Sequence, residues 1–113
     1  MNKYEKIGDT VLIGLPEEVD DYKAERMVED TEEMFKDRRI KYVVFDFKDT
    51  KMMDSAGIGL ITRRSRDVYD RGGKVFVMNE SERMEKLLKM SGIYRITEKT
   101  ENIEAAYKSV HSL

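Results

Sequence analysis

Short apolar runs alternate along this chain with longer segments whose apolar residues recur every three or four positions. The runs at residues 10–15, 41–47 and 74–78 are rich in β-branched and aromatic residues, which is typical of β-strands. The middle run has four apolar residues in a row, and this indicates a central strand that is covered on both faces. A turn at Gly8-Asp9 is expected to pair the first run with an N-terminal edge strand at about residues 2–7.

Four other segments have the periodicity of amphipathic helices. The first has Asp20 or Asp21 as its N-cap, and the second covers residues 57–69 and ends before the glycines at 72 and 73. The third begins at Asn79, which has the spacing of a capping box with Glu82, and ends at Gly92. The apolar positions of the first and last helices are Ala24, Met27, Val28, Thr31, Met34 and Phe35, and Ile103, Ala106, Tyr107 and Val110.

The alternation of strands with helices predicts the fold class. Such an order indicates parallel strands that are joined by crossover connections, after an initial antiparallel hairpin. Residues 93–97 are predicted to add a short edge strand. The expected fold is α/β: one domain over residues 1–113, with a mixed four- to five-stranded sheet and about four helices packed against it.

The composition excludes several function classes. The chain has 113 residues, which fits one domain, and its formal charge of −2 lacks the basic excess of a nucleic-acid-binding domain. It has no cysteine, which excludes disulfides, thiol catalysis and cysteine-based zinc sites. No apolar run approaches the roughly 18 residues of a membrane span, and the N-terminus lacks the apolar core of a signal peptide. We therefore expect a cytoplasmic protein with no membrane contact.

Few residues suggest catalysis. The segment Gly57-Ile58-Gly59 lacks the third glycine and the acidic partner of a dinucleotide-binding fingerprint. The only histidine, His111, is close to the C-terminus, where side chains are usually solvated. Asp46, Asp49 and Asp54 could bind magnesium near the end of the middle strand, although their strand and loop positions favour structural roles. We expect no catalytic residue, no cofactor and no metal site.

Arginines give the second predicted helix a basic character. Charge on a helix is usually its solvated face, and the interleaved Asp67 and Asp70 favour that interpretation. An electrostatically steered interface is the alternative. The arginines concerned are Arg63, Arg64, Arg66 and Arg71.

The loop before the second helix, residues 51–60, has the most informative chemistry of the chain. Asp54 and Ser55 are both good N-cap residues, so they mark a helix start with free N–H groups and a partial positive charge. A serine hydroxyl on this loop is accessible to the active site of another protein. The alternative is that Ser55 only caps the helix.

Apolar residues and glycines surround this serine. Met52, Met53 and Ile58 form a flexible apolar rim that suits protein recognition, and the alternative is that the methionines fill the core. Gly57 and Gly59 are expected to leave room for the backbone of a partner.

The motif Asp54-Ser55-Ala56-Gly57-Ile58-Gly59 closely resembles the Asp-Ser-x-Gly-Leu-Gly motif of bacterial anti-sigma factor antagonists, which are built on the STAS domain. Residues 71–75 and 84–93 resemble the family's turn into its next strand and the segment after that strand. Glu18-Val19-Asp20 is similar to its Gly-Glu-Leu-Asp signature, with Glu17 in place of the glycine. The resemblance covers nearly the whole chain, in the same order of elements.

This resemblance implies a role in the regulation of transcription by partner switching. In the family, the serine after the motif aspartate is phosphorylated by an anti-sigma factor with serine kinase activity, and that serine matches Ser55. The unphosphorylated form would bind the anti-sigma factor and release a sigma factor, and a phosphatase acting on phospho-Ser55 would reset the switch. No direct contact with nucleic acid is implied, and the protein is expected to be a monomer or weak dimer.

The resemblance and the loop chemistry together name one set of partner-binding residues. Ala56 replaces a second hydroxyl that is often found beside the phosphorylated serine, which leaves one acceptor. The Leu15-Pro16-Glu17 segment is unusual for the family, and this loop contributes to partner contacts there. The expected partner-binding residues are Asp20, Asp21, Met52, Met53, Asp54, Ser55, Ala56, Gly57, Ile58 and Gly59.

Three other function classes stay open at this point. The same fold could be a scaffold or sensor module in a larger signalling assembly, without phosphorylation. A receiver-like domain phosphorylated on aspartate would carry an acid-labile acyl phosphate, whereas a phosphoserine persists in acid. An enzyme of unknown chemistry is the third alternative, although no pair of nucleophile and base is visible.

Overall fold

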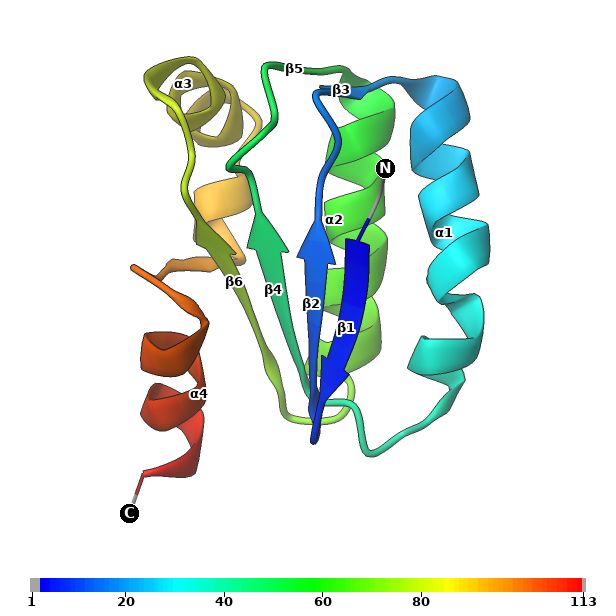
Figure 1. Ribbon diagram of the computed structural model, residues 1–113, viewed down its shortest axis with the longest axis vertical. Helices are drawn as coiled ribbons and strands as arrows, with labels where there is room; N and C mark the ends of the chain where they lie inside the picture. The colour runs from blue at the N-terminus through cyan, green and yellow to red at the C-terminus, as the bar shows by residue number, and fades with distance from the viewer. Residues whose placement is uncertain (1–2, 113) are drawn as a thin grey trace.

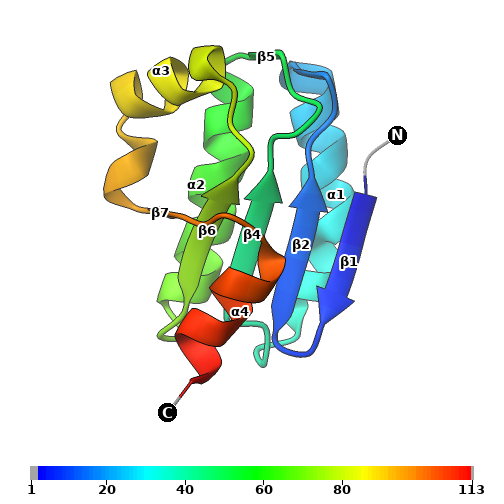
Figure 2. The same ribbon diagram turned by 60° about the vertical axis from the view of Figure 1, so that its left-hand side comes forward.

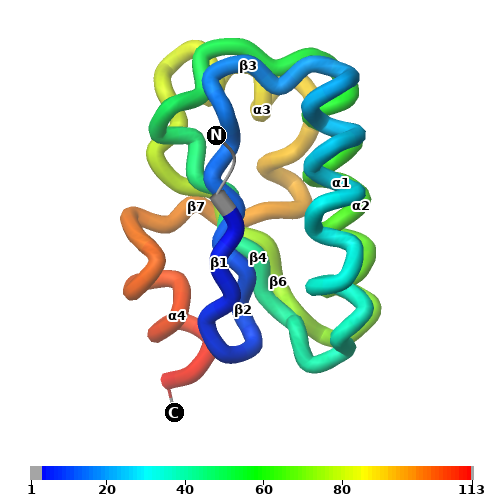
Figure 3. The backbone as a smooth tube through the Cα atoms, turned by 45° about the vertical axis from the view of Figure 1, so that its right-hand side comes forward, coloured from blue at the N-terminus to red at the C-terminus, as the bar shows by residue number. Residues whose placement is uncertain are grey.

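The computed structural model describes residues 3–112, which form a mixed sheet between two layers of helices (Figure 3). The sheet has five strands in the order β1-β2-β4-β6-β7. Only the β1–β2 pair is antiparallel, and the remaining neighbours are parallel. The predicted α/β fold with a mixed sheet is therefore confirmed. These strands are β1 (Lys3–Ile7), β2 (Thr10–Gly14), β4 (Tyr42–Asp46), β6 (Lys74–Met78) and β7 (Glu98–Lys99).

The hairpin of β1 and β2 turns at Gly8 and Asp9, as the sequence predicts. The Asn2 end of the predicted first strand lies outside the described residues. Strand β4 is the central strand, and Val43 and Val44 on its opposite faces are both fully buried. The continuous apolar run thus correctly indicates a strand with a core on each side.

Residues 3–112 contain four α-helices around the sheet, and they are α1 (Asp21–Lys36), α2 (Ser55–Tyr69), α3 (Glu82–Met90) and α4 (Ile103–His111). Helices α1 and α2 lie side by side on one face, and α4 crosses the other face (Figures 1 and 2). The larger core lies under α1 and α2, and a smaller one gathers Val44, Phe76, Met78 and Ala106 beneath α4. Among the described residues, no helix is both long enough and apolar enough to span a bilayer.

A second, small sheet lies beyond the carboxyl ends of β2 and β4, and the sequence pattern did not predict it. It pairs β3 (Glu18–Val19) with β5 (Met52–Met53) in parallel, next to the first turns of α1 and α2 (Figure 1). A strand of two residues gives no periodic signal, so only the tertiary structure can show such a pairing.

Two sequence predictions near α3 are wrong. The helix begins at Glu82 and its N-cap is Ser81, whose hydroxyl accepts from the Met84 N–H at 3.1 Å. Asn79 has a left-handed backbone conformation with φ of 62°, and its side chain donates to Asp46 instead of capping a helix. Residues 93–95 form a short 3₁₀ helix, η1 (Ile93–Arg95), and the edge strand β7 follows at residues 98–99.

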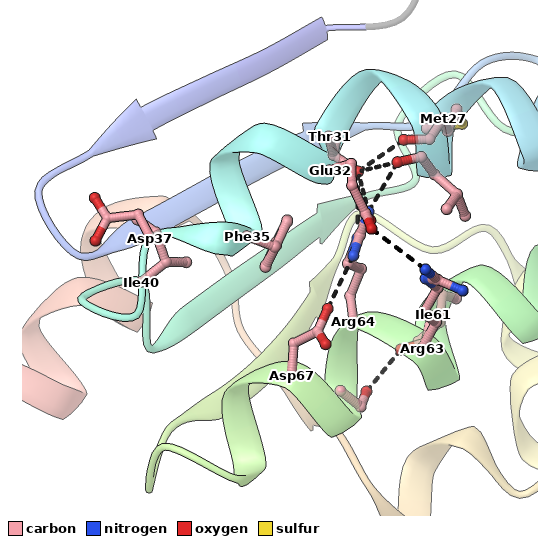
Figure 4. A network of polar contacts seen from close by, with 12 residues as sticks. Met27, Thr31, Glu32, Phe35, Asp37, Ile40, Ile61, Arg63, Arg64 and Asp67 are labelled. Carbon is pink, nitrogen blue, oxygen red and sulfur yellow. Dashed lines mark hydrogen bonds and ion pairs between the residues drawn. The ribbon is translucent and has the colours of Figure 1, made fainter.

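The predicted solvated arginine face of α2 is wrong for Arg64, which is buried between α1 and α2 and 1% exposed (Figure 4). Its guanidinium donates to the Thr31 hydroxyl at 2.8 and 3.2 Å and to the Val28 carbonyl oxygen at 2.9 Å. It also pairs with Asp67 at 2.8 Å and Glu32 at 3.2 Å. The charge is therefore compensated and holds the two helices together.

Arg71 is also a structural residue rather than a solvated one. It donates to the backbone oxygens of Phe35, Asp37 and Ile40, at distances of 2.6, 3.1 and 3.0 Å. These carbonyl groups lie at the end of α1 and just beyond it, where the helix itself supplies no partner. The other two arginines, Arg63 and Arg66, are exposed as the sequence predicts.

Candidate functional site

Ser55 is the first residue of α2 and is exposed to solvent. Asp54 is the N-cap, and its carboxylate accepts a hydrogen bond from the Ala56 N–H at 2.9 Å. The helix thus begins two residues before the predicted start at Gly57. The Ser55 hydroxyl has no hydrogen-bond partner within residues 3–112. Capping is therefore done by Asp54, and the alternative that Ser55 only caps the helix is wrong.

The small sheet brings the two predicted partner-binding segments together. The backbone oxygen of Glu17 accepts from the Lys51 N–H at 2.7 Å and from the Met52 N–H at 3.1 Å. The Asp54 N–H donates to the Val19 oxygen at 3.1 Å. As a result, Asp20 and Asp54 follow directly on paired strands, although more than thirty residues separate them in the sequence.

Both of these aspartates are helix N-caps. Asp20 accepts from the Lys23 N–H at 2.9 Å at the start of α1, as Asp54 does at the start of α2. The positive ends of two helix dipoles therefore lie next to one another beside Ser55. The sequence prediction of Asp20 or Asp21 as the first cap is confirmed for Asp20.

A shallow depression of about 140 Å³ lies between the two paired segments. Its lining consists of Glu18, Val19, Asp20, Met52, Met53 and Asp54. Val19 is buried, Met53 is half-buried and Met52 is 49% exposed, so the apolar rim expected from the sequence is formed mainly by Met52.

Gly57 does not leave room for a partner, and that part of the sequence prediction is wrong. The residue is buried, and a Cβ atom placed on it would come within 2.3 Å of Met53 Cγ. The missing side chain instead allows Met53 to pack against the first turn of α2. Gly59 is exposed and has no atom within 4 Å of an added Cβ, so its surface is open as expected. Ala56 and Ile58 are half-buried.

Tyr22 was not predicted from the sequence pattern, and it lies in the first turn of α1 with 68% of its surface exposed. This side chain follows Asp20 and Asp21 directly, so it extends the same surface. The available signal was an aromatic residue outside the apolar stripe of its helix. A large exposed ring is uncommon on a solvated helix face and is enriched in protein interfaces.

Asp46, at the end of the middle strand, has structural partners in the fold. Within the described residues, no group of three or more possible metal ligands converges. Asp46 accepts from the Lys48 N–H and from the Asn79 side chain, both at 2.9 Å, so it stabilises the turn after β4. This agrees with the structural interpretation of Asp46 rather than the magnesium alternative.

His111 is exposed, as the sequence predicts, and it also has specific partners. Its Nε2 lies 2.9 Å from an Asp9 carboxylate oxygen, and its Nδ1 lies 2.9 Å from the Tyr107 backbone oxygen. The ring stacks on Tyr107 with 4.0 Å between centroids. The hydrogen bond to Asp9 raises the pKa of His111 above its usual value. These contacts attach the end of α4 to the β1–β2 turn and lie away from Ser55.

The STAS domain model matches residues 2–111, which is nearly the whole chain. This chain belongs to the STAS domain family. It is 27% identical over 86 residues to the anti-sigma F factor antagonist of Paenibacillus polymyxa, an alignment that covers 76% of this chain and 74% of that protein.

Solved STAS structures show the same fold over the whole chain. The anti-sigma factor antagonist SpoIIAA in its unphosphorylated form aligns with a TM-score of 0.79 and 22% identity, with full coverage of both chains. The phosphorylated form of SpoIIAA, described as a Bacillus cell fate determinant, aligns with a TM-score of 0.77 and 24% identity, over 98% of this chain and 100% of that one. At these identities the structures establish the STAS fold.

Proposed function

We propose that this STAS protein is an anti-sigma factor antagonist that is inactivated by phosphorylation of Ser55. In this proposal the unphosphorylated protein binds an anti-sigma factor through the surface formed by β3, β5 and the first turns of α1 and α2. Binding releases a sigma factor. The names of the relatives support the partner class, and the free, exposed hydroxyl of Ser55 supports the modification site.

The main support for this proposal is that Asp54 caps the helix, while the Ser55 hydroxyl makes no hydrogen bond within the described residues. Because Asp54 caps the helix, the Ser55 hydroxyl is not needed for the fold and can be modified without loss of a structural hydrogen bond. A kinase would transfer the γ-phosphoryl group of ATP to Ser55 Oγ, with release of ADP and of the hydroxyl proton. A phosphatase acting on phospho-Ser55 would restore the binding form.

Phosphorylation would act differently on folding and on binding. It adds about −1.5 to −2 charges at a helix N-terminus, which is a favourable place for an anion. At the interface, the same group adds bulk and a desolvation cost beside Asp54, in a surface that already holds Asp20 and Glu18. A loss of about 3–4 kcal/mol in the free energy of binding would weaken the complex a few hundredfold, which is enough to switch it off.

The test uses the purified protein with each anti-sigma factor that is encoded in its own genome. The protein is incubated with ATP and magnesium, and intact mass followed by site mapping reports any phosphate. We expect one added phosphate on Ser55 with at least one of these kinases, and none on the Ser55→Ala variant. Binding to the same kinase, measured by calorimetry, should be retained by Ser55→Ala and weakened by Ser55→Asp.

Two results would contradict the proposal in different ways. Binding without any phosphate on Ser55 would favour the scaffold or sensor alternative for this STAS domain. Absence of binding and of phosphate with every anti-sigma factor tested would reject the antagonist function itself. Since sigma factors act where transcription takes place, the proposal also places the protein in the cytoplasm.

A further inference from the structure

An apolar groove runs beside α4, on the face of the sheet that carries the smaller core. It has a volume of about 370 Å³ and is lined by Ile7 at the end of β1 and by Ile103, Glu104, Tyr107 and Lys108 on α4. Helix α4 has only nine residues and crosses this face obliquely (Figure 2). A helix this short leaves part of the apolar surface beside it uncovered. Ile7 and Ile103 are both only half-buried.

Tyr107, which forms one side of the groove, is held in place before any partner binds. Its ring is 37% exposed and stacks on His111. His111 is in turn fixed by Asp9 and lies edge-on to Tyr42 at 5.6 Å between centroids. An aromatic ring whose orientation is already set loses little conformational freedom on association, and such rings dominate the energy of many interfaces.

The charged side chains at the edge of this groove can pair with the same side chains of a second copy of the chain. Glu104 and Lys108 lie one helical turn apart on α4, and both are exposed. Neither has an ion-pair partner among the residues that the structure describes. If two α4 helices pack antiparallel about a two-fold axis, each Glu104 faces a Lys108, and the two pairs flank the tyrosines.

The neighbouring strand edge offers a less suitable contact. The outer edge of β1 has no partner strand within the described residues, but this strand carries the charged Glu5 and Lys6. Charged side chains on an edge strand oppose strand-to-strand association. The self-complementary surface is therefore the α4 groove rather than the sheet edge.

We infer that this groove binds a second copy of the chain, through antiparallel contact of two α4 helices. In the dimer, Glu104 pairs with Lys108 of the partner subunit, and Tyr107 closes the apolar groove. The groove is lined by only five residues, against roughly 20–30 residues a side in a stable interface, so we expect a weak dimer with a dissociation constant on the order of 100 μM. It involves neither β3 nor β5, and it stands independently of the proposed function.

The test is a charge exchange followed by analytical ultracentrifugation. The variants Glu104→Lys and Lys108→Glu each place like charges opposite one another in the dimer, at both pairs. We expect the dimer of each variant alone to have a dissociation constant at least tenfold higher than that of the parent protein. An equimolar mixture of the two variants should associate again. In the mixed dimer, the α4 helix of one variant carries two positive charges at these positions, and the facing helix carries two negative charges.

The matched control is Lys89→Glu, an exposed charge reversal on α3 that should leave association unchanged. Circular dichroism confirms that each variant is folded. A parent protein that sediments as a monomer up to about 1 mM would overturn the inference, and so would a dimer that both reversals leave intact. Failure of the mixed variants to associate would also overturn it.

Discussion

Gly57 packs against Met53, so closely that a Cβ atom on Gly57 would come within 2.3 Å of Met53 Cγ. This contact joins the first turn of α2 to strand β5, on which the loop before Ser55 depends. The glycine of the motif is therefore explained by packing inside the protein, while the serine two positions earlier faces solvent. One short segment thus combines a structural residue and a candidate modification site.

The first prediction concerns this contact. Gly57→Ala forces Met53 out of its position, and we expect a net loss of about 1 kcal/mol in the free energy of unfolding, measured in urea. Overpacking costs about 1–3 kcal/mol, and the higher helix propensity of alanine offsets about 1 kcal/mol of it. Gly59→Ala is the matched control. The methyl group that it adds contacts no other atom, so this change should stabilise the protein by about 0.5–1 kcal/mol. Equal effects of the two changes would refute the role of the Met53 contact.

The second prediction separates folding from docking at Ser55. An acidic residue at the first position of α2 interacts favourably with the helix dipole, although Asp54 beside it offsets part of this gain. We therefore expect Ser55→Asp to keep the unfolding free energy within about 0.5 kcal/mol of the parent. Ser55→Lys, with the opposite charge, should be less stable than Ser55→Asp. A loss of more than about 1 kcal/mol in Ser55→Asp would show that the hydroxyl has a structural role.

The third prediction concerns the buried arginine between α1 and α2. Arg64→Ala removes the donor for Thr31, the Val28 oxygen, Asp67 and Glu32, and leaves a cavity between the helices. We expect a loss of about 3–5 kcal/mol in unfolding free energy. Arg63→Ala provides the control on the neighbouring residue. Arg63 is exposed and pairs with Glu32 only at 3.5 Å, so its removal should change stability by less than about 0.5 kcal/mol.

The fourth prediction is a pH dependence at His111. Because the hydrogen bond to Asp9 raises its pKa, protonation of His111 is favoured in the folded state. Its contribution to stability is fully present below the unfolded pKa of about 6.5 and is lost as pH rises through the higher folded pKa. The single histidine makes the NMR titration unambiguous. We expect a midpoint above about 6.5 in the parent and a lower midpoint in Asp9→Asn.

The unfolding experiment checks the same contact. The stability difference between the parent and Asp9→Asn should be larger near pH 5.5 than near pH 8.5. A parent titration at the ordinary histidine value, unchanged by Asp9→Asn, would show that the contact does not persist in solution. This outcome would also remove the support that His111 gives to Tyr107 in the α4 groove.

Local patterns were sufficient for the main elements of the fold. The apolar run at 41–47 identifies the central strand because burial on both faces removes the need for alternation. The spacing of Ala24, Met27 and Val28 identifies α1 because one stripe faces the sheet. The start of α3 was misplaced because Asn79 and Ser81 are both acceptable caps, and the backbone of Asn79 turns left-handed after β6.

Periodicity and short motifs were enough to establish an α/β protein of the STAS type, with Ser55 at a helix start. Both conclusions depend on residues that are close together in the chain. The folded arrangement was needed to show that Asp20 lies beside Asp54, that Gly57 faces Met53 rather than a partner, and that Arg64 is buried. The physical reason is that each of these contacts joins segments that are distant in the chain or depends on which side of a helix faces its neighbour.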